Sequence, residues 1–133
     1  LEGPYQIQPE MITELGQQLE DACVFTYRDN VFMFSRNMGG RKNLSSGLLW
    51  QSNDGWLFKS DNIVKGFGKL IDYVGRSALK NRKTYRGPST GHLERPQLLF
   101  KNGNPKYLYL ATGLSPEEGF GSCSHVFKIE WKK

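Results

Sequence analysis

The sequence of 133 residues predicts an all-β fold in which consecutive antiparallel strands form small sheets. Short apolar runs recur along the chain, and polar segments rich in Gly, Asn and Asp separate them. Residues 21–34 and 95–112 share one layout: a charged residue, an apolar strand, a polar turn and an aromatic-rich strand. This weak repetition, at a spacing of about 74 residues, favours two similar units with an insertion between them.

The first unit spans about residues 20–60 and is expected to contain four strands. Apolar runs at 22–27 and 31–36 flank the turn "RDN", and Asp and Asn suit a tight reversal. Two further strands are expected in "SGLLWQS" and "WLFKS", joined by a hairpin turn at Asp54-Gly55. Four consecutive antiparallel strands match the size and order of one β-propeller blade.

The second unit spans about residues 92–131 and is expected to contain three strands, "PQLLF", "KYLYLAT" and "HVFKIEW". Between the units, residues 61–91 lack alternation, and apolar side chains at helical spacing around Leu70 predict one short helix before an irregular loop. The opening "LEGPYQI" reads as the outer strand of a preceding blade. The predicted fold is therefore propeller-like, with about two to two and a half four-stranded blades in one partial domain covering residues 1–133.

Composition and charge limit the classes of function. Apolar residues make up 38% of the chain, enough for a core, and no apolar run reaches the roughly 20 residues of a membrane span. The net charge of +5 is concentrated in one basic segment: Arg76, Lys80, Arg82, Lys83 and Arg86. This segment is either a patch for an anionic polymer or a solvated face. Aromatic residues are not interleaved with it, so we expect no nucleic-acid partner. Because no apolar run is long enough to span a membrane, we also expect no membrane partner.

The two cysteines, Cys23 and Cys123, are interpreted as free thiols, with a disulfide as the alternative. No signal peptide is visible, and the cellular compartment stays open on these residues alone. The sequence indicates no metal site and no cofactor.

Two acidic residues stand where a propeller would place an active site. Asp21 precedes the first strand of one unit and Glu94 precedes the first strand of the next. In a propeller these strand ends open onto one face, so the two carboxyl groups are expected to converge there. Glycosidic bond cleavage needs an acid to protonate the leaving oxygen and further carboxylates to tune it and activate water.

The stretch "LEGPYQI…LEDACVF", followed by "HLERPQLLFKNGNPKYLYLATG", resembles the five-bladed propeller glycosidases of glycoside hydrolase family 43 and its relatives, including family 117. Those enzymes carry a "GPY" or "GPW" strand, an acidic residue before a strand, and later an "E-R-P" or "E-x-P" blade start. The resemblance implies an inverting, exo-acting hydrolase of plant or algal oligosaccharides. It also implies a periplasmic or secreted location and no cofactor.

The resemblance implies roles for five residues. Glu94 matches the general-acid glutamate, and Asp21 matches the aspartate that tunes this acid. In the family 117 branch a histidine is thought to be the acid, which makes His92 a second candidate. Arg95 and Glu20 are then substrate contacts. In "SNDGW", which resembles a blade turn of the family, Asp54 is interpreted as structural.

The general-base aspartate of these enzymes comes from a first blade that this chain lacks. Asp29, Asp61 and Asp72 are better explained as turn or surface residues. The chain therefore resembles the C-terminal part of such an enzyme and is expected to self-associate or to pair with a missing N-terminal portion.

Other interpretations stay open. The chain is alternatively a non-catalytic carbohydrate-binding propeller fragment, or a basic nucleic-acid-binding β domain favoured by net charge alone. Glu20-Asp21 is then an acidic turn, Glu94-Arg95 a structural ion pair, and His92 a surface residue. Turnover of an aryl glycoside separates the hydrolase from the binding fragment.

Overall fold

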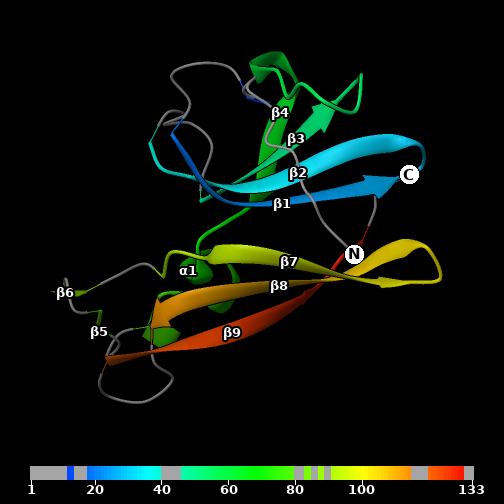
Figure 1. Ribbon diagram of the computed structural model, residues 1–133. Coiled ribbons are helices and arrows are strands. Elements are labelled where there is room, and N and C mark those ends of the chain that lie inside the picture. Colours follow the sequence, from blue (N-terminus) through cyan, green and yellow to red (C-terminus); the bar gives the residue numbers. More distant parts are fainter. Residues whose placement is uncertain are drawn as a thin grey trace, which may run out of the picture.

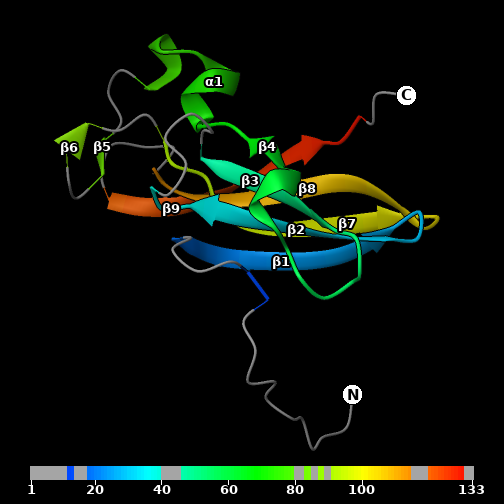
Figure 2. The same cartoon turned by 90° about the horizontal axis from the view of Figure 1, so that it is seen from above.

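The computed structural model shows two antiparallel β-sheets that lie one over the other (Figures 1 and 2). The described residues are 12–13, 18–39, 46–79, 83–84, 87–88, 91–114 and 120–130. The predicted all-β class is confirmed, since two sheets of four and three strands dominate this part of the chain.

The first sheet has the order β1-β2-β3-β4, so each strand pairs with its neighbour in sequence. Its strands are β1 (Leu19–Tyr27), β2 (Asn30–Asn37), β3 (Gly47–Ser52) and β4 (Ile63–Phe67). The first three agree with the predicted runs: β1 buries alternate side chains on one face, and β2 and β3 bury side chains on both faces.

The fourth strand is not the predicted "WLFKS", and the predicted hairpin at Asp54-Gly55 is wrong. The Asp54 carboxylate accepts hydrogen bonds from the Ser52 hydroxyl and from the amides of Trp56 and Leu57, at 2.8–2.9 Å. These bonds hold a loop in place of a two-residue turn, which confirms the structural role of Asp54. The chain then passes through Phe58 and a 3₁₀ turn, Ser60–Asn62, before β4 begins.

The second sheet has the order β7-β8-β9, with β7 at Glu94–Lys101, β8 at Asn104–Leu114 and β9 at Phe120–Lys128. Its three strands were predicted, although β9 begins and ends earlier than "HVFKIEW". The connecting segment contains the predicted short helix and three smaller elements. The helix is α1 (Leu70–Val74). The smaller elements are η2 (Ser77–Leu79), β5 (Lys83–Thr84) and β6 (Gly87–Pro88).

The two hairpins β1-β2 and β7-β8 share the same turn, although β7-β8 has an additional register shift between Leu99 and Phe100. Residues 28–29 and 102–103 form their turns, and all four have positive φ angles between 48° and 72°. Asn30 and Asn104 follow these turns, and each donates its side-chain amide to the carbonyl two residues earlier, at 2.7 and 2.9 Å. The spacing of 74 residues therefore relates two turns of the same structure as well as two similar stretches of sequence.

A β-bulge interrupts the start of β1 and the start of β7 at matching positions. Asp21 and Arg95 have φ angles of 56° and 52°, and the strand pairing slips beside each of them. Glu20 consequently matches Glu94, and Asp21 matches Arg95. The expectation that Asp21 and Glu94 occupy equivalent positions is wrong by one residue.

Two hydrophobic clusters stabilise the sheets. The inner core, between the two sheets, consists of Phe25, Tyr27, Phe34, Phe67, Leu70, Leu79, Leu93, Leu108 and Leu110. The outer core covers the other face of the first sheet and consists of Met33, Leu48, Trp50 and Phe58. The buried indole of Trp50 donates to the Ser35 hydroxyl at 2.8 Å, so its polar atom is satisfied.

Cys23 and Cys123 are free thiols, and burial raises the pKa of the Cys23 thiol. The predicted outer strand "LEGPYQI" and most of the basic segment lie outside the described residues. In the described part, no helix has the length and apolar character needed to cross a membrane.

Candidate functional site

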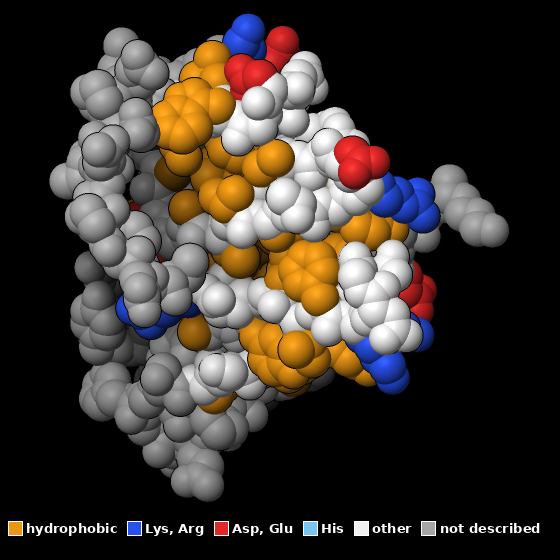
Figure 3. Space-filling model, turned by 45° about the vertical axis from the view of Figure 1, so that its right-hand side comes forward, with side chains coloured by type: hydrophobic (Ala, Val, Ile, Leu, Met, Phe, Trp, Pro, Cys, Tyr) orange, Lys and Arg blue, Asp and Glu red, His pale blue; other side chains and the backbone are white. Residues whose placement is uncertain are grey.

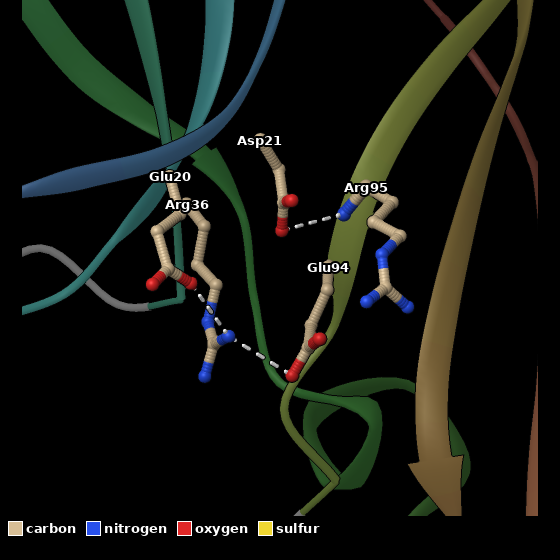
Figure 4. A network of polar contacts seen from close by, with 5 residues as sticks. All are labelled: Glu20, Asp21, Arg36, Glu94 and Arg95. Atoms are coloured by element: carbon tan, nitrogen blue, oxygen red, sulfur yellow. Dashed lines mark hydrogen bonds and ion pairs between the residues drawn. The ribbon is translucent and has the colours of Figure 1, made fainter.

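The starts of β1 and β7 contribute four of the five predicted site residues to one polar cluster, which Figure 4 shows. Glu20 and Asp21 come from β1, and Glu94 and Arg95 come from β7. The two strands belong to different sheets, so the cluster forms only because the sheets stack with these edge strands together.

Arg36, near the end of β2, is the centre of this cluster. Its Nη1 atom lies 3.2 Å from a Glu20 carboxylate oxygen and 3.1 Å from a Glu94 carboxylate oxygen. The Arg36 side chain is only 20% exposed, which makes these charge-assisted contacts stronger than ordinary surface pairs. One guanidinium therefore ties the two sheets together.

Arg36 was missed by the sequence analysis. The available signal was an arginine at the end of the apolar run "VFMFS", close to the point where the hairpin returns to Asp21. A single charge at a strand end is common, so this signal alone does not mark a site.

Asp21 makes the second contact between the sheets. Its Oδ2 atom accepts a hydrogen bond from the backbone amide of Arg95 at 3.2 Å. The guanidinium of Arg95 points away from Asp21, on the far side of β7 (Figure 4). Arg95 thus enters the cluster through its backbone, and its expected contact with substrate stays a prediction.

His92 lies two residues before Glu94, the first residue of β7, and is exposed at the surface. Partial burial of its ring lowers the pKa of His92 below its ordinary value. The positive charges of Lys69 and Arg36 add to this effect, while the carboxylate of Glu94 opposes it. At neutral pH the imidazole is therefore uncharged, and it can donate one hydrogen bond and accept another.

Three other aspartates, Asp29, Asp61 and Asp72, lie in turns or at the start of a helix. Asp29 lies in the β1-β2 turn, at the opposite end of β1 from Asp21, and Asp61 lies in the 3₁₀ turn. The Asp72 carboxylate accepts the backbone amide of Lys69 at 2.9 Å and caps α1. Their predicted turn and surface roles agree with these positions.

The cluster combines three carboxylates with one shared arginine. Such a set can bind hydroxyl groups of a polar ligand and can exchange protons with it. Among the described residues, no group of three or more His, Cys, Asp or Glu side chains is arranged to hold a metal ion.

Comparison with known proteins adds no relative. No protein-family model matches the chain, and no curated protein and no solved structure matches it.

Proposed function

We propose that the chain is part of a propeller-type glycoside hydrolase of the inverting, exo-acting kind, with plant or algal oligosaccharides as substrates. One observation carries the proposal: Glu20, Asp21, Arg36 and Glu94 meet where the first strands of two repeated units begin. In a propeller the first strands line the central channel, which is where a sugar site is expected. The two sheets are then neighbouring blades, and the residues between them form an insertion.

Glu94 is the proposed general acid, and Arg36 controls when it acts. In the free protein Glu94 accepts a contact from Arg36, whereas a general acid must carry a proton. Catalysis therefore requires a bound sugar to displace Arg36 from Glu94. Glu20 can retain Arg36 during this step, because the same Nη1 atom already contacts both carboxylates.

His92 fits a second role better than the role of acid. A lowered pKa leaves its imidazole without the proton that a general acid needs at neutral pH. The neutral ring suits a hydrogen bond to a sugar hydroxyl next to Glu94. Asp21, which accepts a hydrogen bond from the backbone amide of Arg95, is the proposed partner of the general acid Glu94, as the resemblance implies.

The general base is proposed to lie in another part of the assembled enzyme. The proposed partners are therefore a carbohydrate and either a second copy of the chain, by self-association, or an N-terminal portion, which would complete the ring. The resemblance favours a periplasmic or secreted location.

The test uses activated aryl glycosides together with azide, a nucleophile that replaces base-activated water. We expect slow release of the aryl group that increases with azide, and a glycosyl azide of inverted configuration. Glu94→Gln should lower turnover of poor leaving groups by about 10²–10⁴-fold and affect good leaving groups much less. His92→Ala should weaken sugar binding and leave the leaving-group dependence unchanged.

Glu130→Gln is the matched control, because Glu130 is an exposed glutamate paired with Lys128 at 3.0 Å, away from the cluster. It should leave every rate unchanged. If Glu94→Gln and Glu130→Gln behave alike on all substrates, Glu94 is not the acid.

The alternative is a carbohydrate-binding fragment without catalysis. It is favoured by the contacts of Arg36, which engage both glutamates in holding the sheets together. Oligosaccharide binding by calorimetry, without aryl glycoside turnover in azide, would support this alternative over the hydrolase.

A further inference from the structure

The second sheet has one covered face and one open face. Its inner face packs against the first sheet, whereas its outer face leaves Leu99, Tyr109 and Val126 exposed at 48%, 37% and 54%. Figure 3 shows hydrophobic side chains gathered across one side of the molecule, with several Lys and Arg side chains at the edge of that side. Exposed apolar side chains grouped on one sheet face mark an interaction surface more often than scattered ones do.

Comparison of the two repeated hairpins shows which face of the first sheet corresponds to the open face of the second sheet. Strand pairing matches the outer face of the second sheet, position by position, with the face that the first sheet buries in the inner core. The matched sets are Phe25, Phe32, Phe34 and Leu49 in the first sheet, and Leu99, Tyr107, Tyr109 and Val126 in the second.

The two sheets therefore stack head to tail. The face that the first sheet presents to its neighbour is the one that the second sheet leaves open. Side chains at these positions are large and apolar in both sheets, although a tyrosine stands at two of the open positions. This open face therefore has an apolar centre, with Gln97 and Lys128 on the same face in the two edge strands.

We infer that the outer face of the second sheet is a self-association surface, occupied by the same face of a second copy of this chain. In a head-to-tail pair, the open face of one copy would pack against the outer face of the first sheet of the other copy. Phe58 and Ile12 already cover that outer face in each copy. Head-to-tail stacking of two copies is therefore blocked. A symmetric pairing of two open faces buries the apolar side chains of both and closes at two subunits.

Charge selects the orientation of this pair. Lys101 and Lys128 lie at the same end of the second sheet, where β7 and β9 end and β8 begins. When the strands of the two copies run in opposite directions, these lysines lie at opposite ends of the interface. The parallel arrangement would bring the two Lys101 side chains to the same end and is disfavoured, whereas Lys128 is already paired with Glu130 at 3.0 Å.

The size of the face predicts a weak dimer. With strands about 4.8 Å apart and about 3.3 Å per residue, a three-stranded sheet of this length offers about 400 Å². This is below the roughly 800 Å² per partner of a stable interface. Interfaces of this size are weak and transient, so we expect a Kd on the order of tens of micromolar. The inference concerns the face used for association and does not depend on glycosidase activity.

The test is sedimentation equilibrium from about 1 to 500 μM, the range that brackets this Kd. The unmodified chain should pass from monomer to dimer, and Val126→Lys should raise the Kd at least about tenfold. Val24→Lys is the matched control: Val24 is also on an edge strand and 52% exposed, but on the outer face of the first sheet. Its Kd should equal that of the unmodified chain.

A second measurement needs no substitution. Methyl NMR shifts of Val126 in the unmodified chain should change with concentration, while those of Val24 should not. A monomer throughout the concentration range, larger oligomers, or a dimer weakened by Val24→Lys and not by Val126→Lys would each overturn the inference.

Discussion

The two sheets contain the same hairpin, yet the matched faces of these hairpins have opposite environments. Phe25 is 7% exposed and Phe34 is 6% exposed, whereas their counterparts Leu99 and Tyr109 are 48% and 37% exposed. Local sequence determines the turn and the alternating direction of the side chains along each strand. The neighbouring layer determines whether a side chain is buried. A repeated pattern thus predicts a strand better than it predicts burial.

The largest effect expected from this comparison is at Phe25. Phe25→Ala removes a ring stacked on Phe32 and Phe34, with centroids 5.5 Å apart, and should lower the free energy of unfolding by about 3–5 kcal/mol. Leu99→Ala, at the matched open position, should cost only about 0.5 kcal/mol. Urea unfolding at low micromolar protein measures both.

Leu108→Ala controls for residue type, because Leu108 is a leucine on the covered face of the same sheet and is 5% exposed. It should cost about 2–5 kcal/mol. Equal losses for Leu99→Ala and Leu108→Ala would show that both faces of the second sheet are buried in the monomer.

A smaller effect is expected where the sheets are joined by charge. Arg36→Met leaves the carboxylates of Glu20 and Glu94 without their shared partner and should cost about 1–3 kcal/mol in unfolding free energy. Lys128→Met breaks the exposed pair with Glu130 and should cost about 0.5 kcal/mol or less. If both variants unfold at the same urea concentration, Arg36 does not join the sheets energetically.

The smallest effect on stability is expected at Asp54 when the pH is lowered. Hydrogen bonds from Trp56, Leu57 and Ser52 lower the pKa of Asp54 to about 2, from an ordinary 3.8. The charged carboxylate therefore contributes stability that is fully present above about pH 4 and is lost as the pH falls through 2. Asp54→Asn cannot titrate, so its unfolding free energy should fall less steeply between pH 5 and 2. Parallel pH profiles for the two proteins would contradict this origin.

Much of the fold was predictable because its signals are local. Alternating apolar residues and tight turns identified β1, β2, β7 and β8, and helical spacing identified α1. The error at Asp54-Gly55 has a specific cause. The sequence Asp54-Gly55 suits both a two-residue hairpin turn and a loop closed by the aspartate carboxylate. The loop forms because Phe58 is buried on the outer face of the first sheet.

The site was predictable in its carboxylates but not in its centre. The turn of the first hairpin pairs Tyr27 with Asn30, and an uninterrupted register would place Asp21 opposite Arg36. The bulge shifts the pairing by one residue, so that Glu20 faces Arg36 and Asp21 turns toward the second sheet. A bulge at a non-glycine residue has no clear sequence signal, and the contact between β1 and β7 is a property of the stacked sheets.

Both sheets are meanders, in which every strand pairs with the next one along the chain. Forming each sheet therefore closes only loops of ten residues or fewer, which costs little chain entropy. We expect the hairpins of each sheet to form early and independently. Docking of the two sheets then brings together residues 74 positions apart, such as Asp21 and Arg95, as a later event. Amide exchange should accordingly show two cooperative units that open separately, with the central strands β2, β3 and β8 protected longest.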